Sequence, residues 1–305
     1  MFAFVTSDRF LPLDPKDRDR LESLSKLDEF AAGEQISTAG TPIDWLYLIA
    51  SGAVEVRART ASGGEVTLCQ LNPGDLFGEL ESFCELPLGV RHVALKDTIV
   101  RAVPKNPLMQ KLKVHRSLAS GLLTVYCRSI SEKLRATNEV AVRLTNAPAA
   151  SRPPPPSQTP PAPAAGGPRP SHLSEVEAAW IGLLGQRMAV PAGETVVAEG
   201  DTSRSFYVVE QGELEVRKHV EGAPEKTLAR LGARDLFGFM SFVDGKPRSA
   251  SVVSLGESQL ARVEPDALDR ALHLNFTVSF KFLGTLCGVL GRTYRDTAQK
   301  IIAAS

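Results

Sequence analysis

The sequence lacks the features of several large classes of protein. It has four cysteines in 305 residues and no CxxC pair, so neither a disulfide framework nor a zinc knuckle is expected. Lysine plus arginine and aspartate plus glutamate number 35 each, and no segment is strongly basic, which argues against a nucleic-acid partner. The longest apolar run, 276–290, is interrupted by Lys281 and is too short to cross a bilayer. We expect a cytoplasmic protein without a membrane segment.

Catalytic and metal-binding patterns are missing as well. The five histidines show neither HxH nor HExxH spacing, and no serine, histidine and aspartate are arranged as in a hydrolase. Apolar residues make up 43% and charged residues 23% of the chain, which is the balance of a globular protein. We therefore expect a globular, non-enzymatic protein without a metal site.

Proline is concentrated in one segment. Ten of the 21 prolines lie in residues 147–171, which contain no large apolar side chain. Such a segment is expected to be an extended linker that reaches roughly 80 Å at about 3.1 Å per residue. It predicts two domains, residues 1–146 and 172–305, and cleavage between Pro153 and Pro170 is expected to leave two folded fragments.

The two flanking segments are repeats of each other. The two members of every matching pair are separated by the same number of residues as Gly40 and Gly200. This constant spacing is called the repeat offset below. The shared register indicates a tandem duplication. The other matching pairs are Ala32-Gly33-Glu34 and Ala192-Gly193-Glu194, Tyr47 and Tyr207, Gly52 and Gly212, Glu55-Val56-Arg57 and Glu215-Val216-Arg217, and Asp75-Leu76-Phe77-Gly78 and Asp235-Leu236-Phe237-Gly238.

Each repeat begins with short strands and ends with a long helix. Alternating residues in 45–49, 54–57 and 66–69 predict strands, and glycine-containing turns such as 62–64 separate them. The predicted fold class is therefore mainly β with α: two jelly-roll-like β-rolls, each followed by a long C-terminal helix.

The two predicted helices carry a coiled-coil seam. Its alternating spacing of four and three residues predicts helix-to-helix pairing, and pairing between chains and pairing between the two halves of one chain both stay open. Pairing between chains would make the protein a homodimer, since the seams would otherwise expose a large apolar surface. The seam residues are Leu123, Cys127, Ile130, Leu134, Thr137, Ala141 and Leu144 in the first repeat, and Phe276, Phe280, Leu283, Cys287, Leu290, Tyr294, Thr297 and Ile301 in the second.

Several spaced motifs agree in both repeats. They are Phe30 to Glu34, Gly40, Leu46 to Val56 and Gly74 to Leu80 in the first, and Ala192 to Glu194, Glu199 to Asp201 and Asp235 to Ser251 in the second. With these motifs the sequence resembles the cyclic nucleotide-binding domain family. The resemblance implies a β-roll with a phosphate-binding cassette, a short helix whose first amides face a cyclic phosphate.

The resemblance also implies ligand-binding residues in both cassettes. A glycine lets the backbone approach the ligand, an arginine pairs with the phosphate oxygens, and a glutamate accepts the ribose 2′-hydroxyl proton. The implied ligand is cAMP or cGMP, and the residues do not choose between them. The candidate residues are Gly78, Glu79, Leu80 and Arg91 in the first repeat, and Gly238, Met240, Arg248, Ser249 and Ser251 in the second.

Both cassettes depart from the family pattern. Phe239 stands where the family has the glutamate, and losing that acceptor costs about 1.5–3 kcal/mol, or roughly ten- to a hundredfold in affinity. In the first repeat the repeat offset places Leu88 opposite Arg248, and Arg91 follows three residues later. We expect the first copy to keep its affinity, with three extra residues bulging outward so that Arg91 reaches the phosphate. Alternatively, Glu79 pairs with Arg91 across an empty cassette.

Two functions remain open. The first is a cytoplasmic, non-catalytic sensor that binds a cyclic nucleotide and repacks its C-terminal helices to act on a protein partner. The alternative is a degenerate, ligand-free adaptor that dimerises through those helices. A transcription factor is disfavoured because a proline-rich segment, and not a helix-turn-helix, follows Leu144. Residues 1–30 also lack the Arg-Arg-x-Ser/Ala inhibitory segment implied for kinase regulatory subunits of this family.

Overall fold

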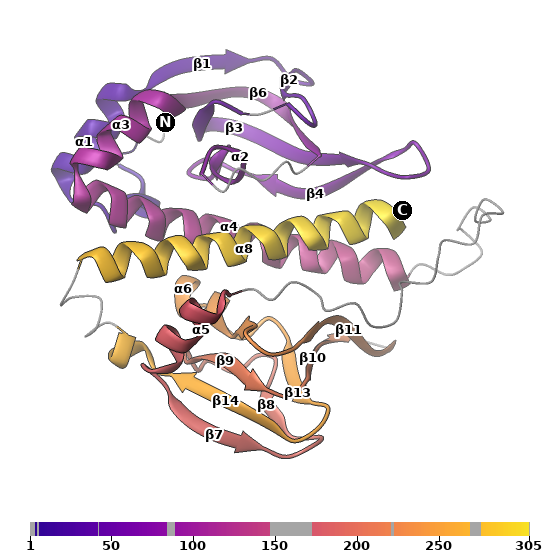
Figure 1. Cartoon of the computed structure of the whole chain (residues 1–305). Coiled ribbons are helices and arrows are strands. Elements are labelled where there is room, and N and C mark those ends of the chain that lie inside the picture. Colours follow the sequence, from indigo (N-terminus) through magenta and orange to yellow (C-terminus); the bar gives the residue numbers. More distant parts are fainter. Residues whose placement is uncertain are drawn as a thin grey trace. The chain divides into compact units, whose positions relative to one another are not determined.

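The chain forms two compact units that differ from the two repeats. The computed structural model describes residues 4, 6–41, 43–83, 89–146, 173–220, 223–268 and 276–304 (Figure 1). The last helix and a short piece of the second repeat belong with the first repeat. Unit 1 comprises Met1–Ala141, Phe242–Lys246 and Pro265–Ser305, and unit 2 comprises Val142–Ser241 and Pro247–Glu264. The predicted linker, 147–171, lies outside the described residues.

The β-roll of unit 1 is built around two long antiparallel strands. These are β3 (Trp45–Arg59) and β6 (Val90–Pro104). Residues 46–50 of β3 are buried without interruption, so this strand supplies much of the apolar core. The flanking strands are β1 (Lys26–Phe30) and β2 (Gln35–Ser37), which pair with β6, and β4 (Glu65–Leu71) and β5 (Leu76–Phe77), which pair with β3.

Helices precede, interrupt and follow this roll. Helix α1 begins at Pro15, and the preceding Asp14 caps it by accepting a hydrogen bond from the backbone N–H of Asp17 at 2.8 Å. The helices before and within the roll are the 3-10 helix η1 (Asp8–Phe10), α1 (Pro15–Leu24) and α2 (Glu79–Phe83). The helices after it are α3 (Lys105–Val114) and α4 (Arg116–Asn146).

The last helix, α8 (Phe276–Ala304), pairs with α4 inside unit 1. The Cys127 thiol donates to the Leu283 carbonyl at 3.7 Å, and Figure 1 shows the two helices side by side. The C-terminal end of α8 also reaches the β-roll, where the Ala61 N–H donates to the Ile302 carbonyl at 3.1 Å. The helix pairing that the sequence left open therefore occurs within one chain.

The paired helices bury the middle of both predicted seams. The buried members are Leu123, Cys127, Ile130, Leu134, Thr137, Cys287, Leu290, Tyr294 and Ile301. Exposure of these residues was the argument for a homodimer, and it no longer applies because the chain covers them itself.

Unit 2 contains the second β-roll, in two four-stranded antiparallel sheets. One has the order β11 (Ala223–Leu231), β10 (Leu214–Val220), β13 (Ser251–Ser254) and β8 (Thr195–Val197). The other has the order β12 (Leu236–Phe237), β9 (Phe206–Gln211), β14 (Ser258–Val263) and β7 (Gln186–Val190). Its core is formed by the buried residues Val190, Val197, Tyr207, Val209, Leu214, Leu231, Phe237, Val252 and Leu260.

Two shorter helices accompany the second roll. Helix α5 (Glu175–Gly182) precedes β7, and Ser174 caps it through a capping box with Glu177. Helix α6 (Phe239–Asp244) follows β12, as α2 follows β5 in the first roll.

The predicted fold class is confirmed, because each repeat forms a β-roll that a long helix follows in the sequence. Among the described residues, no helix is both long enough and apolar enough to cross a bilayer.

Candidate functional site

The first cassette begins at a sharp backbone turn. Gly78 has a φ of +88°, and a Cβ atom there would lie 2.2 Å from the Trp45 carbonyl oxygen, so only glycine fits without moving the backbone. Glu79 opens α2 and is 0% exposed, and the adjacent Leu80 is 3% exposed. The turn therefore directs a carboxylate into the protein interior.

Helix α4 binds this carboxylate. Oε1 of Glu79 accepts a hydrogen bond from Ser129 Oγ at 3.2 Å and forms an ion pair with Nζ of Lys133. Ser129 and Lys133 are one helical turn apart, so both side chains reach the same oxygen. The alternative in which Glu79 pairs with Arg91 is therefore wrong, since its charged partner comes from α4.

Arg91 lies on β6 and binds residues outside the cassette. Its Nη1 donates to Oε1 of Gln35 at 3.0 Å, and its Nη2 pairs with Oε2 of Glu65 at 2.5 Å. The guanidinium thus binds residues of β2 and β4, and it contacts neither Glu79 nor Gly78 in the hydrogen bonds of the described residues.

The outward bulge expected before Arg91 is also wrong. Gly33 donates to the Ala94 carbonyl at 2.8 Å, and Gly193 donates to the Ser254 carbonyl at the same distance. The repeat offset therefore still holds after the cassette, and it leaves no room for three extra residues. Arg91 takes the position of Ser251, and Leu88, which corresponds to Arg248, lies outside the described residues.

A buried histidine fills the wall of the first roll near the cassette. The His92 ring stacks on Phe77 with 4.7 Å between centroids, and Phe77 stacks on Tyr47 at 4.6 Å. Nδ1 of His92 lies 2.7 Å from Oγ of Ser37. Burial and, to a lesser extent, the positive charge of Lys133 lower the pKa of His92 to about 3. His92 is therefore a neutral packing residue.

His92 and Glu81 give the unfolding free energy opposite pH dependences. Burial, with the nearby charge of Glu79, raises the pKa of Glu81 to about 7, so folding is favoured less as pH rises from 4.5 to 7. The lowered pKa of His92 makes folding less favourable as pH falls from 6.5 toward 3.

We expect His92→Gln to remove the second of these dependences. Relative to the unchanged chain, the variant is expected to gain about 2 kcal/mol of unfolding free energy between pH 6.5 and 4.5. Urea unfolding at a series of pH values measures this difference. His219→Gln, at an exposed position, is the control, and parallel curves for His92→Gln and the unchanged chain would contradict the assignment.

In the second cassette the arginine is in place. Gly238 has a φ of +78°, and Nη1 of Arg248 donates to its carbonyl at 2.6 Å. Nη2 of Arg248 donates to the Ser205 carbonyl at 2.5 Å, and Nη2 and Nε both reach Oγ of Ser203, at 3.0 and 3.3 Å. The Arg248 residue is 4% exposed. The guanidinium is thus fixed at the start of α6, where a Cβ on Gly238 would lie 2.6 Å from it.

The other predicted residues of the second cassette lie around this arginine. Ser249 Oγ contacts the Met240 sulfur at 3.8 Å, and Ser251 Oγ accepts from the Glu199 N–H at 3.0 Å. Phe239, at the position of the missing glutamate, is 5% exposed. The structure therefore gathers a guanidinium and hydroxyls at this cassette, with an aromatic ring in place of a carboxylate.

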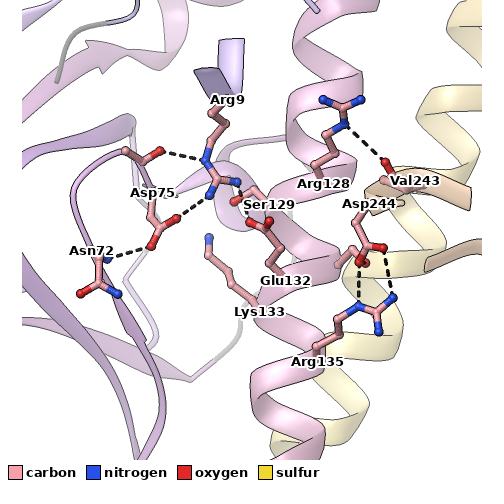
Figure 2. Close-up of polar contacts among 12 residues, drawn as sticks. Arg9, Asn72, Asp75, Arg128, Ser129, Glu132, Lys133, Arg135, Val243 and Asp244 are labelled. Atoms are coloured by element: carbon pink, nitrogen blue, oxygen red, sulfur yellow. Dashed lines mark hydrogen bonds and ion pairs between the residues drawn. The ribbon is translucent and has the colours of Figure 1, made fainter. Parts of the chain in front are cut away.

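The face of α4 opposite Lys133 binds the end of α6. Nε of Arg135 pairs with Oδ2 of Asp244 at 2.7 Å, Ser131 Oγ donates to the same oxygen at 2.7 Å, and Nε of Arg128 donates to the Val243 carbonyl at 3.3 Å. Figure 2 shows Arg135 pointing toward Asp244 and Lys133 leaving α4 on the other side. Consecutive turns of α4 thus hold both Glu79 and Asp244.

Known proteins share this architecture. The family model of the cyclic nucleotide-binding domain matches residues 27–115 and 187–275, two segments that are related by the repeat offset and together cover more than half of the chain. The chain therefore belongs to the cyclic nucleotide-binding domain family, and it carries two copies of the domain.

The curated relatives agree with this assignment, and one solved structure is given beside them for comparison. A cAMP-dependent protein kinase regulatory subunit of Aspergillus fumigatus is 39% identical over 284 residues, which cover 89% of this chain and 56% of the relative. One from Blastocladiella emersonii is 23% identical over 266 residues, covering 87% and 54%. The regulatory domain of Toxoplasma gondii PKA, crystallised with cAMP, has 17% identity, coverage of 88% and 89%, and a TM-score of 0.31. The chain spans about half the length of these curated relatives.

The sequence interpretation missed Ser129 and Lys133. In a helical pattern a serine and a lysine four residues apart are typical of a solvated face, so nothing local marks them. A signal was nevertheless present in the repeat. By the repeat offset Glu79, Ser129 and Lys133 correspond to Phe239, Val289 and Thr293, so the polar set is present in one copy and replaced in the other.

Proposed function

We propose that this chain is a non-enzymatic regulatory protein that binds a cyclic nucleoside monophosphate through its second domain. The observation that carries the proposal is the position of Arg248, whose Nη1 lies 2.6 Å from the Gly238 carbonyl at the start of α6. In the family pattern this is the place of the cyclic phosphate, and a guanidinium binds phosphate oxygens in a bidentate geometry. The sequence hypothesis favoured the first domain, but it depended on Arg91 reaching the cassette.

The nature of the second cassette predicts which part of the ligand is recognised. Arg248 and the hydroxyls near it act on phosphate, which cAMP and cGMP share, so both are candidate ligands. Phe239 offers no acceptor for a ribose 2′-hydroxyl. The second domain is therefore expected to bind a cyclic nucleotide with little regard for its 2′ position.

Helix α6 supplies a route from the ligand to the long helices. It begins beside Arg248 and ends at Asp244, which Ser131 and Arg135 of α4 bind. A phosphate that draws the first turn of α6 toward Arg248 would also move Asp244 at the other end of this helix and so change its bonds with Ser131 and Arg135. The repacking of α4 that follows is the step that would reach a protein partner, as for an allosteric two-state element.

Calorimetric titration of the full chain tests the proposal. We expect cAMP or cGMP to bind, Arg248→Ala to weaken binding about a hundredfold, and Arg248→Lys to restore only part of it, since lysine keeps the charge and loses the fork. Arg262→Ala, on an exposed arginine of the same domain, is the control. We expect 2′-deoxy-cAMP to bind within about threefold of cAMP, because no acceptor is lost. Unchanged binding by Arg248→Ala would contradict the proposal.

The ligand-free adaptor is the second candidate. It is favoured by one observation, the ion pair that already engages the acceptor of the first cassette. An absence of binding by every nucleotide in this titration would make the adaptor the better account.

Location and assembly belong to the proposal as well. The buried thiols of Cys69, Cys127 and Cys287 support a reducing compartment such as the cytoplasm. A homodimer would need a surface other than the helix seams. Light scattering decides this, and we expect the mass of a single chain, 32.8 kDa.

A further inference from the structure

The first cassette holds a buried polar trio. Glu79 is 0% exposed, the Lys133 side chain is 5% exposed, and Ser129 is 3% exposed, so all three groups are removed from water. A buried carboxylate is stable only when it is paired and hydrogen-bonded. Ser129 and Lys133 meet both needs at Oε1 from one turn of α4, whereas Oε2 of Glu79 has no hydrogen-bond partner among the described residues.

The neighbouring acids do not compete for the lysine. Asp75, Glu132 and Lys133 line one small pocket beside the middle of α4. Arg9 binds both acids, through Nη2 to Asp75 at 2.5 Å and Nη1 to Glu132 at 2.7 Å (Figure 2). Asp75 and Glu132 thus share Arg9, and the cation of Glu79 is Lys133.

The two repeats differ at these three positions together. Where the first has an acid, a hydroxyl and an ammonium, the second has Phe239, Val289 and Thr293. If Lys133 were only a surface residue of α4, its presence would not depend on whether the same repeat has the glutamate. The pattern within this one chain therefore ties Lys133 and Ser129 to the carboxylate of the first cassette.

We propose that Lys133 and Ser129 are a built-in occupant of the first nucleotide site. Their donors take the place that the hydroxyls of a ribose would take on Glu79. An ammonium binds a carboxylate more strongly than a neutral hydroxyl does, so a ligand that offers only a hydroxyl does not displace it. The first domain is therefore closed to nucleotides, and Lys133 determines this selectivity by positioning α4 against the cassette.

The first test is a double-mutant cycle on the full chain. Glu79→Gln and Lys133→Met are each expected to lower the melting temperature by about 10 °C, because each leaves a buried charge without its partner. The double variant is expected to recover most of this loss. Lys113→Met, on an exposed lysine of α3, is the control. Additive losses in the double variant would overturn the proposal.

The second test asks whether the site opens. Arg248→Ala serves as the background, since it silences the second domain, and the probe is cAMP. We expect no saturable binding in this background at millimolar cAMP. Adding Ser129→Val and Lys133→Thr, the residues that α8 carries at the equivalent positions, is expected to make cAMP binding saturable below millimolar cAMP, with cAMP bound more tightly than 2′-deoxy-cAMP.

The outcomes separate this inference from the proposed function. Binding to Arg248→Ala that depends on the 2′-hydroxyl would show that Glu79 already reads a ligand, and it would overturn the built-in occupant. A folded triple variant with no gain in affinity would overturn it too. If the unchanged chain binds no nucleotide, the proposed function fails. The coupling between Glu79 and Lys133 is still decided independently, by the melting temperatures of the double-mutant cycle.

Discussion

A chain that stops before α8, at residue 275, is expected to lose the cooperative unfolding of unit 1. In unit 1, α8 contacts α4 through Leu283, the first β-roll through Ile302 and Phe242 through Phe282. Its side chains at 2% exposure or less are Phe282, Leu286, Cys287, Val289, Leu290, Tyr294, Ala298 and Ile301. Burying a large apolar side chain contributes about 1.5–3 kcal/mol, so losing the six large ones costs about 9 to 18 kcal/mol, comparable to the whole stability of a typical domain.

Thermal unfolding followed by circular dichroism, together with limited proteolysis, measures this effect. A chain that stops after Ala303 is the matched control, because it keeps the Ile302 carbonyl that Ala61 binds and every buried side chain of α8. A cooperative transition at an unchanged temperature in the chain that ends at residue 275 would contradict the packing described for unit 1.

The same packing changes what proteolysis of the proline-rich segment should give. The sequence predicts that cleavage between Pro153 and Pro170 leaves two folded fragments, on the assumption that each repeat buries its own helix. In the structure α8 lies in unit 1 with α4, although the two helices come from different repeats. The fragments are therefore expected to remain associated after cleavage and to elute together in size-exclusion chromatography.

Local patterns gave a sound prediction of the fold and only a partial one of the site. The β-roll of each repeat and the register of the two repeats depend on neighbours in the sequence, and both are found in the structure. The predicted strands 45–49 and 54–57, however, lie in a single strand, β3. Arg248 could be placed for the same reason, since it follows its cassette closely in the sequence. Its contact with the Gly238 carbonyl agrees with that placement.

The remaining features depend on residues far apart in the chain. Lys133 is 54 residues from Glu79, and the two meet only because α4 crosses the start of α2. The prediction for Arg91 was wrong although this residue is close to its cassette in the sequence. It assigned Arg91 to the phosphate site even though Arg91 lies three residues after the position that corresponds to Arg248. The pairing of β6 with residues 54–58 of β3, which has no register shift, fixes Arg91 opposite Arg57, at the position of Ser251. Strand register therefore outweighs the attraction of an arginine for a distant site.

Asp244→Ala is expected to destabilise unit 1 by about 3 kcal/mol. The Asp244 side chain is 1% exposed and accepts three hydrogen bonds from Ser131 and Arg135, so its removal leaves the Arg135 guanidinium, 17% exposed, without the carboxylate that neutralises it. Asp244→Asn keeps one acceptor and is expected to cost less. Urea unfolding gives the free energies, and the double variant Asp244→Ala with Arg135→Met should recover part of the loss.

The control for Asp244→Ala is a carboxylate on the surface of α8. Asp296→Ala removes a carboxylate that is 57% exposed and pairs with Arg295 on α8, and surface pairs of this kind contribute less than about 1 kcal/mol. Equal effects of the two substitutions would contradict the structure.

Because α6 runs from Arg248 to Asp244, Asp244→Ala should also leave nucleotide affinity measurable. The same substitution should abolish any protection of α4 from hydrogen exchange that the ligand induces. Loss of that protection would identify the end of α6 as the link through which the second domain acts on the long helices.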